Sequence, residues 1–233
     1  MYSIDIMARP IRLEFKGAVY HITARGNKRR DIFSDDTDRR KFLEVLRENV
    51  GRHGIKLTAF VLMGNHYHLL CETPNGNLTE FMHNVQSHYT NYYNRKHDRA
   101  GHKFQGRYKA VLVDRDSYLV ELGRYIHLNP VRAGFVKTPR EWEWSSYRDY
   151  IGPRGSREWI DAGETLRRFG KNRAAAVKNY RKMVESGMDD KNDSPLDAVT
   201  AQVALGGEEF IEKIRGMLKK RGVRRRRTFS RKS

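Results

Sequence analysis

Residues 55–72, IKLTAFVLMGNHYHLLCE, decide the fold class of this chain. Residues 55–63 carry the aliphatic and β-branched side chains typical of a strand, and residues 66–72 resume the same character. Between them, Gly64 and Asn65 form a two-residue turn of the kind that joins antiparallel strands. The stretch therefore predicts a β-hairpin, and the elements on either side of it extend the hairpin into a sheet.

The segments that flank the hairpin predict two more strands and two helices. Strands are expected at residues 19–24 (VYHITA) and 108–113 (YKAVLV), which are short and rich in β-formers. A helix is expected over residues 35–51, where two aspartates begin the segment and a glycine ends it. Apolar side chains recur at helical spacing over residues 78–92, which predicts a long amphipathic helix.

A third helix is expected over residues 117–128, because Asp114 and Asp116 can cap its start and Pro130 is expected to stop it. The preceding elements follow the order strand, helix, strand, strand, helix, strand, which is the split βαβ order of ferredoxin-like folds. We therefore predict an α+β fold with one four-stranded antiparallel sheet and two helices on one face. The third helix is expected to lie against the sheet or its edge.

The C-terminal third of the sequence predicts a small helical extension. Helical patterns recur at residues 162–169, 173–186 and 208–218. We accordingly divide the chain into a main domain at residues 7–152 and an extension at 153–233. Residues 196–205 and the helix after them, with two glycines between, also fit a helix-turn-helix, an alternative that the sequence leaves open.

Charge and cysteine content restrict the class of protein. The 233 residues include 46 basic and 28 acidic side chains, a net charge of +18, and residues 213–233 hold eleven basic side chains and no acid. Such a tail attracts polyanions without reading their sequence, although a solvated end is an equally open interpretation. One cysteine and no long apolar run exclude a disulfide scaffold and a membrane protein, so a cytoplasmic location is expected.

Two histidines at residues 66–68, His-Tyr-His, form a candidate metal site. Side chains alternate along a strand, so His66 and His68 project from one face while Tyr67 enters the core. Two neighbouring imidazoles can bind one divalent cation. The triplet also occurs without a metal, so its meaning depends on the residues that accompany it.

Tyr125 and Asn129 lie four residues apart and would share one face of the third helix. The Asn129 amide oxygen is a candidate third ligand, although the proline after it biases Asn129 away from helical angles. Tyr125 is otherwise expected as a packed core aromatic. Tyr118 is the next candidate for a reactive phenol, and Glu121 is either an aid to proton transfer or a solvated helix charge.

Basic and aromatic residues alternate in two segments, at 25–30 and 103–109, a combination that suits phosphates and unstacked bases. Arg124 on the third helix and Arg132 just after it extend the set, and a solvated surface is the alternative for either loop alone. The candidate nucleic-acid ligands are Arg25, Asn27, Lys28, Arg29, Arg30, Lys103, Arg107, Lys109, Arg124 and Arg132.

Together these motifs resemble the REP-associated tyrosine transposases, a group of single-tyrosine HUH transposases in which HUH denotes two histidines around a hydrophobic residue. The resemblance spans about residues 7–152 and raises the possibility that translation naturally starts at Met7. It rests on the segments 7–10 (MARP), 20–27 (YHITARGN), 66–68 (HYH), 104–109 (FQGRYK), 125–134 (YIHLNPVRAG) and 144–147 (WSSY).

The resemblance implies a function and a set of roles. Tyr125 would be the nucleophile, and His66, His68 and Asn129 would bind Mg²⁺ or Mn²⁺, although the ligand types alone also suit zinc. The protein would cut and rejoin single-stranded DNA near hairpin-forming palindromes through a 5′-phosphotyrosine. It would act as a monomer or a homodimer.

Two other functions compete with this interpretation. Four-stranded sheets of this order also serve as non-catalytic nucleic-acid-binding modules, which would not need paired histidines. A structural zinc domain is disfavoured, because the chain has a single cysteine and no second ligand pair. The remaining histidines are expected to be surface or packing residues: His21, His53, His83, His88, His97, His102 and His127.

Overall fold

The computed structural model describes residues 12–153, 157–190, 194–199 and 203–229, with side chains as far as residue 220. The segment 7–10, on which part of the family resemblance rests, lies outside the described residues, and so do the side chains of the basic tail from residue 221 onward. No helix in the described ranges combines the length and the apolar character that a membrane crossing requires.

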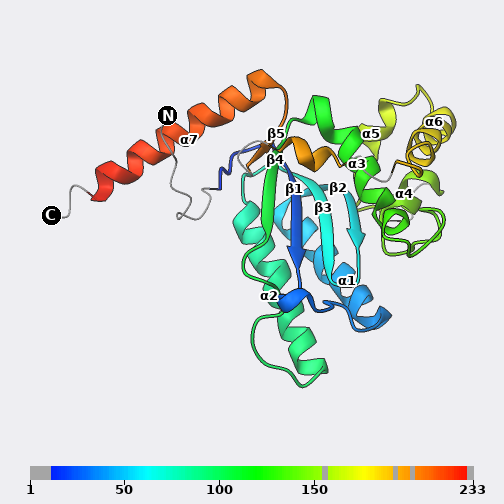
Figure 1. The fold of residues 1–233 in the computed structure, drawn as a ribbon, viewed down its shortest axis with the longest axis horizontal. Helices are drawn as coiled ribbons and strands as arrows, with labels where there is room; N and C mark the ends of the chain where they lie inside the picture. The colour runs from blue at the N-terminus through cyan, green and yellow to red at the C-terminus, as the bar shows by residue number, and fades with distance from the viewer. Residues whose placement is uncertain (1–11, 154–156, 191–193, 200–202, 230–233) are drawn as a thin grey trace.

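The sheet has the order β2-β3-β1-β4-β5, seen at the centre of Figure 1. Strands β1 (Ala18–Arg25), β2 (Lys56–Leu62), β3 (His66–Thr73) and β4 (Lys109–Val113) are antiparallel in the predicted ferredoxin-like order. The prediction of four strands is wrong by one: β5 (Ala204–Leu205) pairs parallel with β4. Two residues are too few to leave a strand pattern in the sequence, and only their backbone bonds to β4 define them.

Helices α1 (Asp36–His53) and α2 (Leu78–Lys96) cover one face of the sheet. Tyr67 enters this face as predicted and is fully buried, with its ring centroid 4.9 Å from that of Phe42. Helix α1 continues beyond the predicted stop at Gly51 and ends at His53. Gly54 caps it with a φ of 62°, a left-handed conformation that glycine adopts freely.

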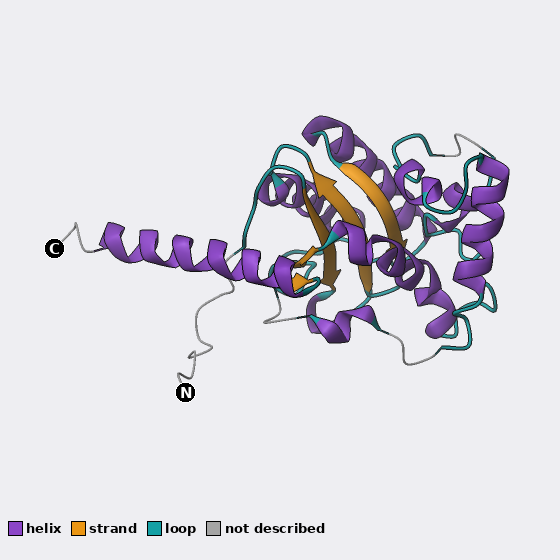
Figure 2. Cartoon of the chain, turned by 90° about the horizontal axis from the view of Figure 1, so that it is seen from above, coloured by secondary structure: helices purple, strands orange, loops and turns teal. Residues whose placement is uncertain are grey.

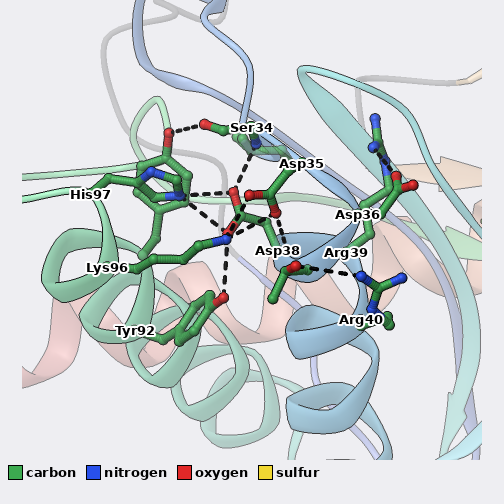
Figure 3. Close-up of polar contacts among 12 residues, drawn as sticks. Ser34, Asp35, Asp36, Asp38, Arg39, Arg40, Tyr92, Lys96 and His97 are labelled. Atoms are coloured by element: carbon green, nitrogen blue, oxygen red, sulfur yellow. Dashed lines mark hydrogen bonds and ion pairs between the residues drawn. The ribbon is translucent and has the colours of Figure 1, made fainter.

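The start of α1 is joined to the end of α2 by a buried carboxylate, drawn in Figure 3. Asp38 is inaccessible to solvent and accepts hydrogen bonds from Lys96 Nζ at 2.8 Å, His97 Nε2 at 2.9 Å and the Ser34 amide at 2.8 Å. Burial alone would raise the pKa of Asp38, but these donors outweigh it and lower the pKa. The contacts hold the two helices together as one layer.

Helix α3 (Arg115–Arg132) covers the opposite face, where Leu122 and Ile126 pack with apolar residues of the strands. The expected stop at Pro130 is wrong, because the helix continues to Arg132. A proline in the last turn removes only its own amide, and the Ala133 amide still bonds to the Asn129 carbonyl at 2.9 Å. Asn129 therefore lies within the helix rather than at a frayed end.

The extension contains α5 (Gly163–Arg167) and α6 (Arg173–Glu185), close to the predicted segments, and α7 (Glu208–Phe229), which begins where predicted but continues past the expected end at residue 218. The short α4 (Tyr147–Ile151) precedes them, and α7 projects away from the sheet in Figures 1 and 2. The helix-turn-helix alternative is wrong, because a 3-10 turn at Pro195–Ala198 and then β5 precede α7. Side chains of α5 and α6 complete the same hydrophobic core as the sheet.

Candidate metal and tyrosine site

The register of β1 and β3 brings three histidines together beneath α3. Thr23 pairs with His68 and Arg25 pairs with His66, so His21 lies diagonally beside His68 on the same face. The His66 and His68 ring centroids are 5.2 Å apart, and those of His21 and His68 are 5.1 Å apart in a stacked arrangement. His68 and His21 are buried, whereas His66 is half-buried.

The side chain of Tyr125 extends from α3 toward the sheet and contacts two of these rings. Its ring meets that of His68 edge-on at a centroid distance of 5.7 Å and that of His21 at 6.3 Å. Tyr125 is only partly buried, and the Arg132 guanidinium carbon lies 5.5 Å from its ring centroid. The structure therefore places a partly buried tyrosine beside the rings of His68 and His21 and near the positive charge of Arg132.

Asn129 follows Tyr125 by one helical turn and is partly buried. Its amide nitrogen donates to the Tyr125 carbonyl at 3.2 Å, which leaves the amide oxygen as the atom able to bind a cation. Within the described part of the chain, no three His, Cys, Asp or Glu side chains are grouped so that they could hold a metal. The Asn129 amide oxygen is the third candidate ligand that the sequence predicts, beside His66 and His68.

Burial keeps the histidines of this face uncharged. It lowers the pKa of His21 to about 4, and burial followed by the charge of Arg25 lowers that of His66 to about 4. The pKa of His68 lies well below its usual value, first from burial and then from His21, His66 and Arg25. Neutral imidazole is the form that coordinates a metal, so the rings are ready to bind at neutral pH.

The donor set fits a divalent cation. His66 Nδ1 is 2.7 Å from Asn65 Oδ1, and His68 Nδ1 is 2.9 Å from His21 Nε2. Each candidate ligand thus uses one ring nitrogen on a protein partner and keeps Nε2 for a metal, as metal-binding histidines commonly do. Two imidazole nitrogens and one amide oxygen would hold the ion and leave positions for other oxygen ligands.

The two predicted basic loops lie side by side at one end of β1. The Asn27 amide bonds to the Lys103 carbonyl at 2.9 Å, and the Gln105 amide bonds to the Arg25 carbonyl at 2.8 Å. Gly26 permits the turn, because a Cβ there would lie 1.9 Å from the Arg30 carbonyl oxygen. The exposed members of the predicted set are Arg25, Asn27, Lys28, Arg29, Arg30, Arg107 and Lys109.

The other three basic candidates are partly buried. Lys103 Nζ lies 3.1 Å from the Tyr93 ring centroid, and burial lowers its pKa. Arg124 is directed toward the extension, since a Cβ on Gly187 would be 3.4 Å from its Cδ. Arg132 faces Tyr125, so of the three it lies nearest the candidate nucleophile.

A buried hydrogen-bond chain fixes α3 from its other side. Tyr180 OH on α6 is 2.8 Å from His127 Nδ1, and His127 Nε2 is 2.8 Å from Ser146 Oγ. Ser146 Oγ in turn accepts from the Phe60 amide on β2 at 2.9 Å. The extension therefore supports the helix that carries Tyr125, and His127 is a packing residue as predicted.

Sequence reasoning did not foresee that His21 contacts His68 or that Asn65 contacts His66. His21 was expected to be a packing or surface residue, and Asn65 to be only a turn residue. Strand alternation places His21 on the face of Thr23, but its position beside His68 depends on the register between β1 and β3. That register joins segments almost fifty residues apart, and no local pattern in the sequence specifies it.

A comparison with protein families gives a match to the model described as "Transposase IS200 like", over residues 14–129, half of the chain. This chain belongs to the IS200-like transposase family. The matched range contains His66, His68, Tyr125 and Asn129. The resemblance to transposases that the sequence motifs indicated is therefore confirmed.

A comparison with solved structures gives two matches to report. One described as "Structure of the REP associates tyrosine transposase bound to a REP hairpin" matches this IS200-like transposase with a TM-score of 0.55 at 18% identity, covering 62% of this chain and 86% of that chain. A putative transposase from Deinococcus radiodurans R1 matches with a TM-score of 0.37 at 17% identity, over 51% of this chain and 95% of that one. The first match shows a shared fold. A search of curated proteins gives no match.

Proposed function

We propose that this IS200-like transposase cleaves and rejoins single-stranded DNA beside hairpin-forming palindromes, with Tyr125 as the nucleophile. The observation that carries the proposal is the partly buried Tyr125 ring, which lies between α3 and the sheet, 5.7 Å from the ring of His68. The related fold solved with a REP hairpin supports a hairpin substrate. An ordinary core tyrosine would not need two neutral imidazoles beside it.

The chemistry is a transfer of a phosphodiester from a 3′ oxygen to a phenol. The Tyr125 oxygen attacks the phosphorus in line, the bond from phosphorus to the 3′ oxygen breaks, and the phenolic proton passes to solvent. The leaving oxygen takes a proton from solvent and becomes a 3′-hydroxyl, while the 5′-phosphate remains on Tyr125. Attack by another 3′-hydroxyl reverses the step, so strand transfer needs no nucleotide cofactor.

The residues around Tyr125 would bind the metal, supply positive charge near the phosphate and bind the DNA backbone. His66, His68 and Asn129 would hold Mg²⁺ or Mn²⁺, which supplies positive charge to the phosphate oxygens as charge develops. Arg132 lies beside the Tyr125 ring and would provide positive charge near the scissile phosphate. The exposed cations of residues 25–30 begin where β1 ends beside His66 and would follow the backbone of the strand.

The proposal also covers the oligomeric state and the roles of the two parts of the chain. Tyr125 contacts His68 of its own chain, which supports cleavage within one protomer in a monomer and in a homodimer alike. Residues 7–152 would contain all the site residues. Residues 153–233 would support α3 through Tyr180 and add basic charge through α7.

A covalent trapping assay tests the proposal. Labelled single strands with a hairpin and randomised flanks are incubated with the protein and Mn²⁺, then separated under denaturing conditions. The wild type is expected to give a protein–DNA band that Tyr125→Phe abolishes and that Tyr118→Phe, a partly buried tyrosine on the same helix, retains. A band that persists in Tyr125→Phe would refute the nucleophile, and chelator-insensitive binding without any band would favour the non-catalytic binding module.

A further inference from the structure

Two side chains outside the proposed ligand set contact the metal-binding histidines directly. Asn65, in the turn before β3, contacts His66, and His21 on β1 contacts His68. These contacts use Nδ1 of each candidate ligand, so they determine what the opposite nitrogen, Nε2, can do. The inference drawn from them rests on the proposed metal site.

Asn65 fixes the proton of His66. Its amide nitrogen donates to the Arg29 carbonyl at 3.2 Å, so its Oδ1 is the atom that faces His66 Nδ1 at 2.7 Å. An amide oxygen only accepts hydrogen bonds, so Nδ1 of His66 must carry the hydrogen. A neutral imidazole has one N–H, and Nε2 of His66 is therefore left with a lone pair.

His21 contacts Nδ1 of His68 in a similar position, but here the contact alone does not fix the tautomer. Its Nε2 lies 2.9 Å from His68 Nδ1, and one of these two atoms carries the hydrogen between them. If His21 donated, His68 would carry its hydrogen on Nε2 and could not bind a cation there. Metal binding thus requires His21 to accept through Nε2 and to keep its own hydrogen on Nδ1.

We propose that Asn65 and His21 are positioning residues of the metal site, which hold His66 and His68 in the Nδ1–H tautomer and direct both Nε2 atoms to one cation. The two residues come from different elements, a hairpin turn and a neighbouring strand, yet they act on the two ligands in the same way. Loss of a residue that hydrogen-bonds to a metal ligand commonly weakens metal affinity by about 10- to 100-fold.

Mn²⁺ affinity of the full-length protein without DNA, measured by electron paramagnetic resonance, tests the proposal. His21→Phe retains a ring of similar size but removes the acceptor, and weaker binding by about 10- to 100-fold is expected. His21→Gln offers an amide oxygen to His68 and is expected to recover most of the affinity. His53→Gln, at a buried histidine on α1 that contacts Asn84, is the matched control and is expected to bind as the wild type does.

The outcomes separate this inference from the proposed function. Wild-type affinity in His21→Phe, together with loss of affinity in His66→Ala, would overturn the positioning role and keep the metal site. Wild-type affinity in both variants would overturn the metal site itself. Thermal unfolding of each variant is measured in parallel, so that a loss of folding is not counted as a loss of binding.

A second measurement reads the tautomers directly. Nitrogen NMR of the imidazoles in the metal-free protein is expected to show the Nδ1–H form for both His66 and His68. Asn65→Ala is expected to release His66 from that form while His68 keeps it. An Nε2–H form of His68 in the metal-free wild type would contradict the proposal.

Discussion

Helix α3 lies between two hydrogen-bond networks that contain histidines, and the two differ in how many ring nitrogens bond to protein. In the closed network, formed by Tyr180, His127 and Ser146, both nitrogens of His127 bond to protein. In the open network, formed by His21, Asn65, His66 and His68, only Nδ1 of each candidate ligand does. Throughout the described ranges, no hydrogen bond reaches Nε2 of His66 or His68.

The difference teaches that burial alone does not mark a reactive histidine. Burial lowers the pKa of His127 to about 3 and that of His66 to about 4, yet only the second ring keeps an unused nitrogen. The closed network ends on the backbone of β2, whereas the open network ends at the partly exposed Tyr125. Substitutions in the open network should therefore reduce cleavage with little change in stability, whereas substitutions in the closed network should reduce stability with little change in cleavage.

The largest expected effect is on cleavage when the open network loses a ligand. His66→Ala should reduce covalent-adduct formation by about 10³-fold or more, because charge on the phosphate oxygens is no longer neutralised. Its free energy of unfolding should change by no more than about 1 kcal/mol, since His66 is half-buried at the start of a strand. Adduct yield and urea unfolding measure the two quantities, and equal adduct yield would place the metal elsewhere.

The closed network should show the reverse. His127→Ala leaves a cavity and removes two buried hydrogen bonds, so the free energy of unfolding should fall by about 2–4 kcal/mol. Adduct formation, assayed at a temperature where the variant is folded, should stay within about tenfold of wild type. A variant that is fully stable but inactive would give His127 a direct role in the reaction.

Acid should weaken the fold through these same rings. His127 has a folded pKa of about 3, below the unfolded value of about 6.5, so the unfolded state binds more protons between these limits. Stability is therefore lost as pH falls below about 6.5, by up to about 1.4 kcal/mol per pH unit for this group. Urea unfolding of the metal-free protein at pH 7 and pH 5 should show a smaller loss in His127→Leu, and an equal loss would exclude His127 as a cause.

The smallest expected effect on stability comes from the removal of a single hydroxyl group. Tyr180→Phe removes the bond from α6 to His127 but retains the ring, so the free energy of unfolding should fall by about 1 kcal/mol. Cleavage should change little if α3 is held mainly by its apolar contacts with the sheet. A large loss of cleavage in a stable Tyr180→Phe protein would show that the extension positions Tyr125 more tightly than its packing indicates.

The sequence predicted what depends on local periodicity and missed what depends on register. Alternation along residues 66–68 places the two histidines on one face, and four-residue spacing places Tyr125 and Asn129 on one side of α3. The helix continues through Pro130 because the rest of the last turn keeps its bonds, which a proline rule does not foresee. His21 and β5 acquire their places only from strands distant in the chain.

Mass spectrometry of the trapped complex tests the central claim most directly. Wild-type protein is incubated with a hairpin single strand and Mn²⁺, digested with nuclease and protease, and searched for a peptide bearing a 5′-phosphonucleotide. The account predicts that the nucleotide is on Tyr125. A nucleotide on any other residue, or cleavage of the strand without a covalent peptide, would contradict it.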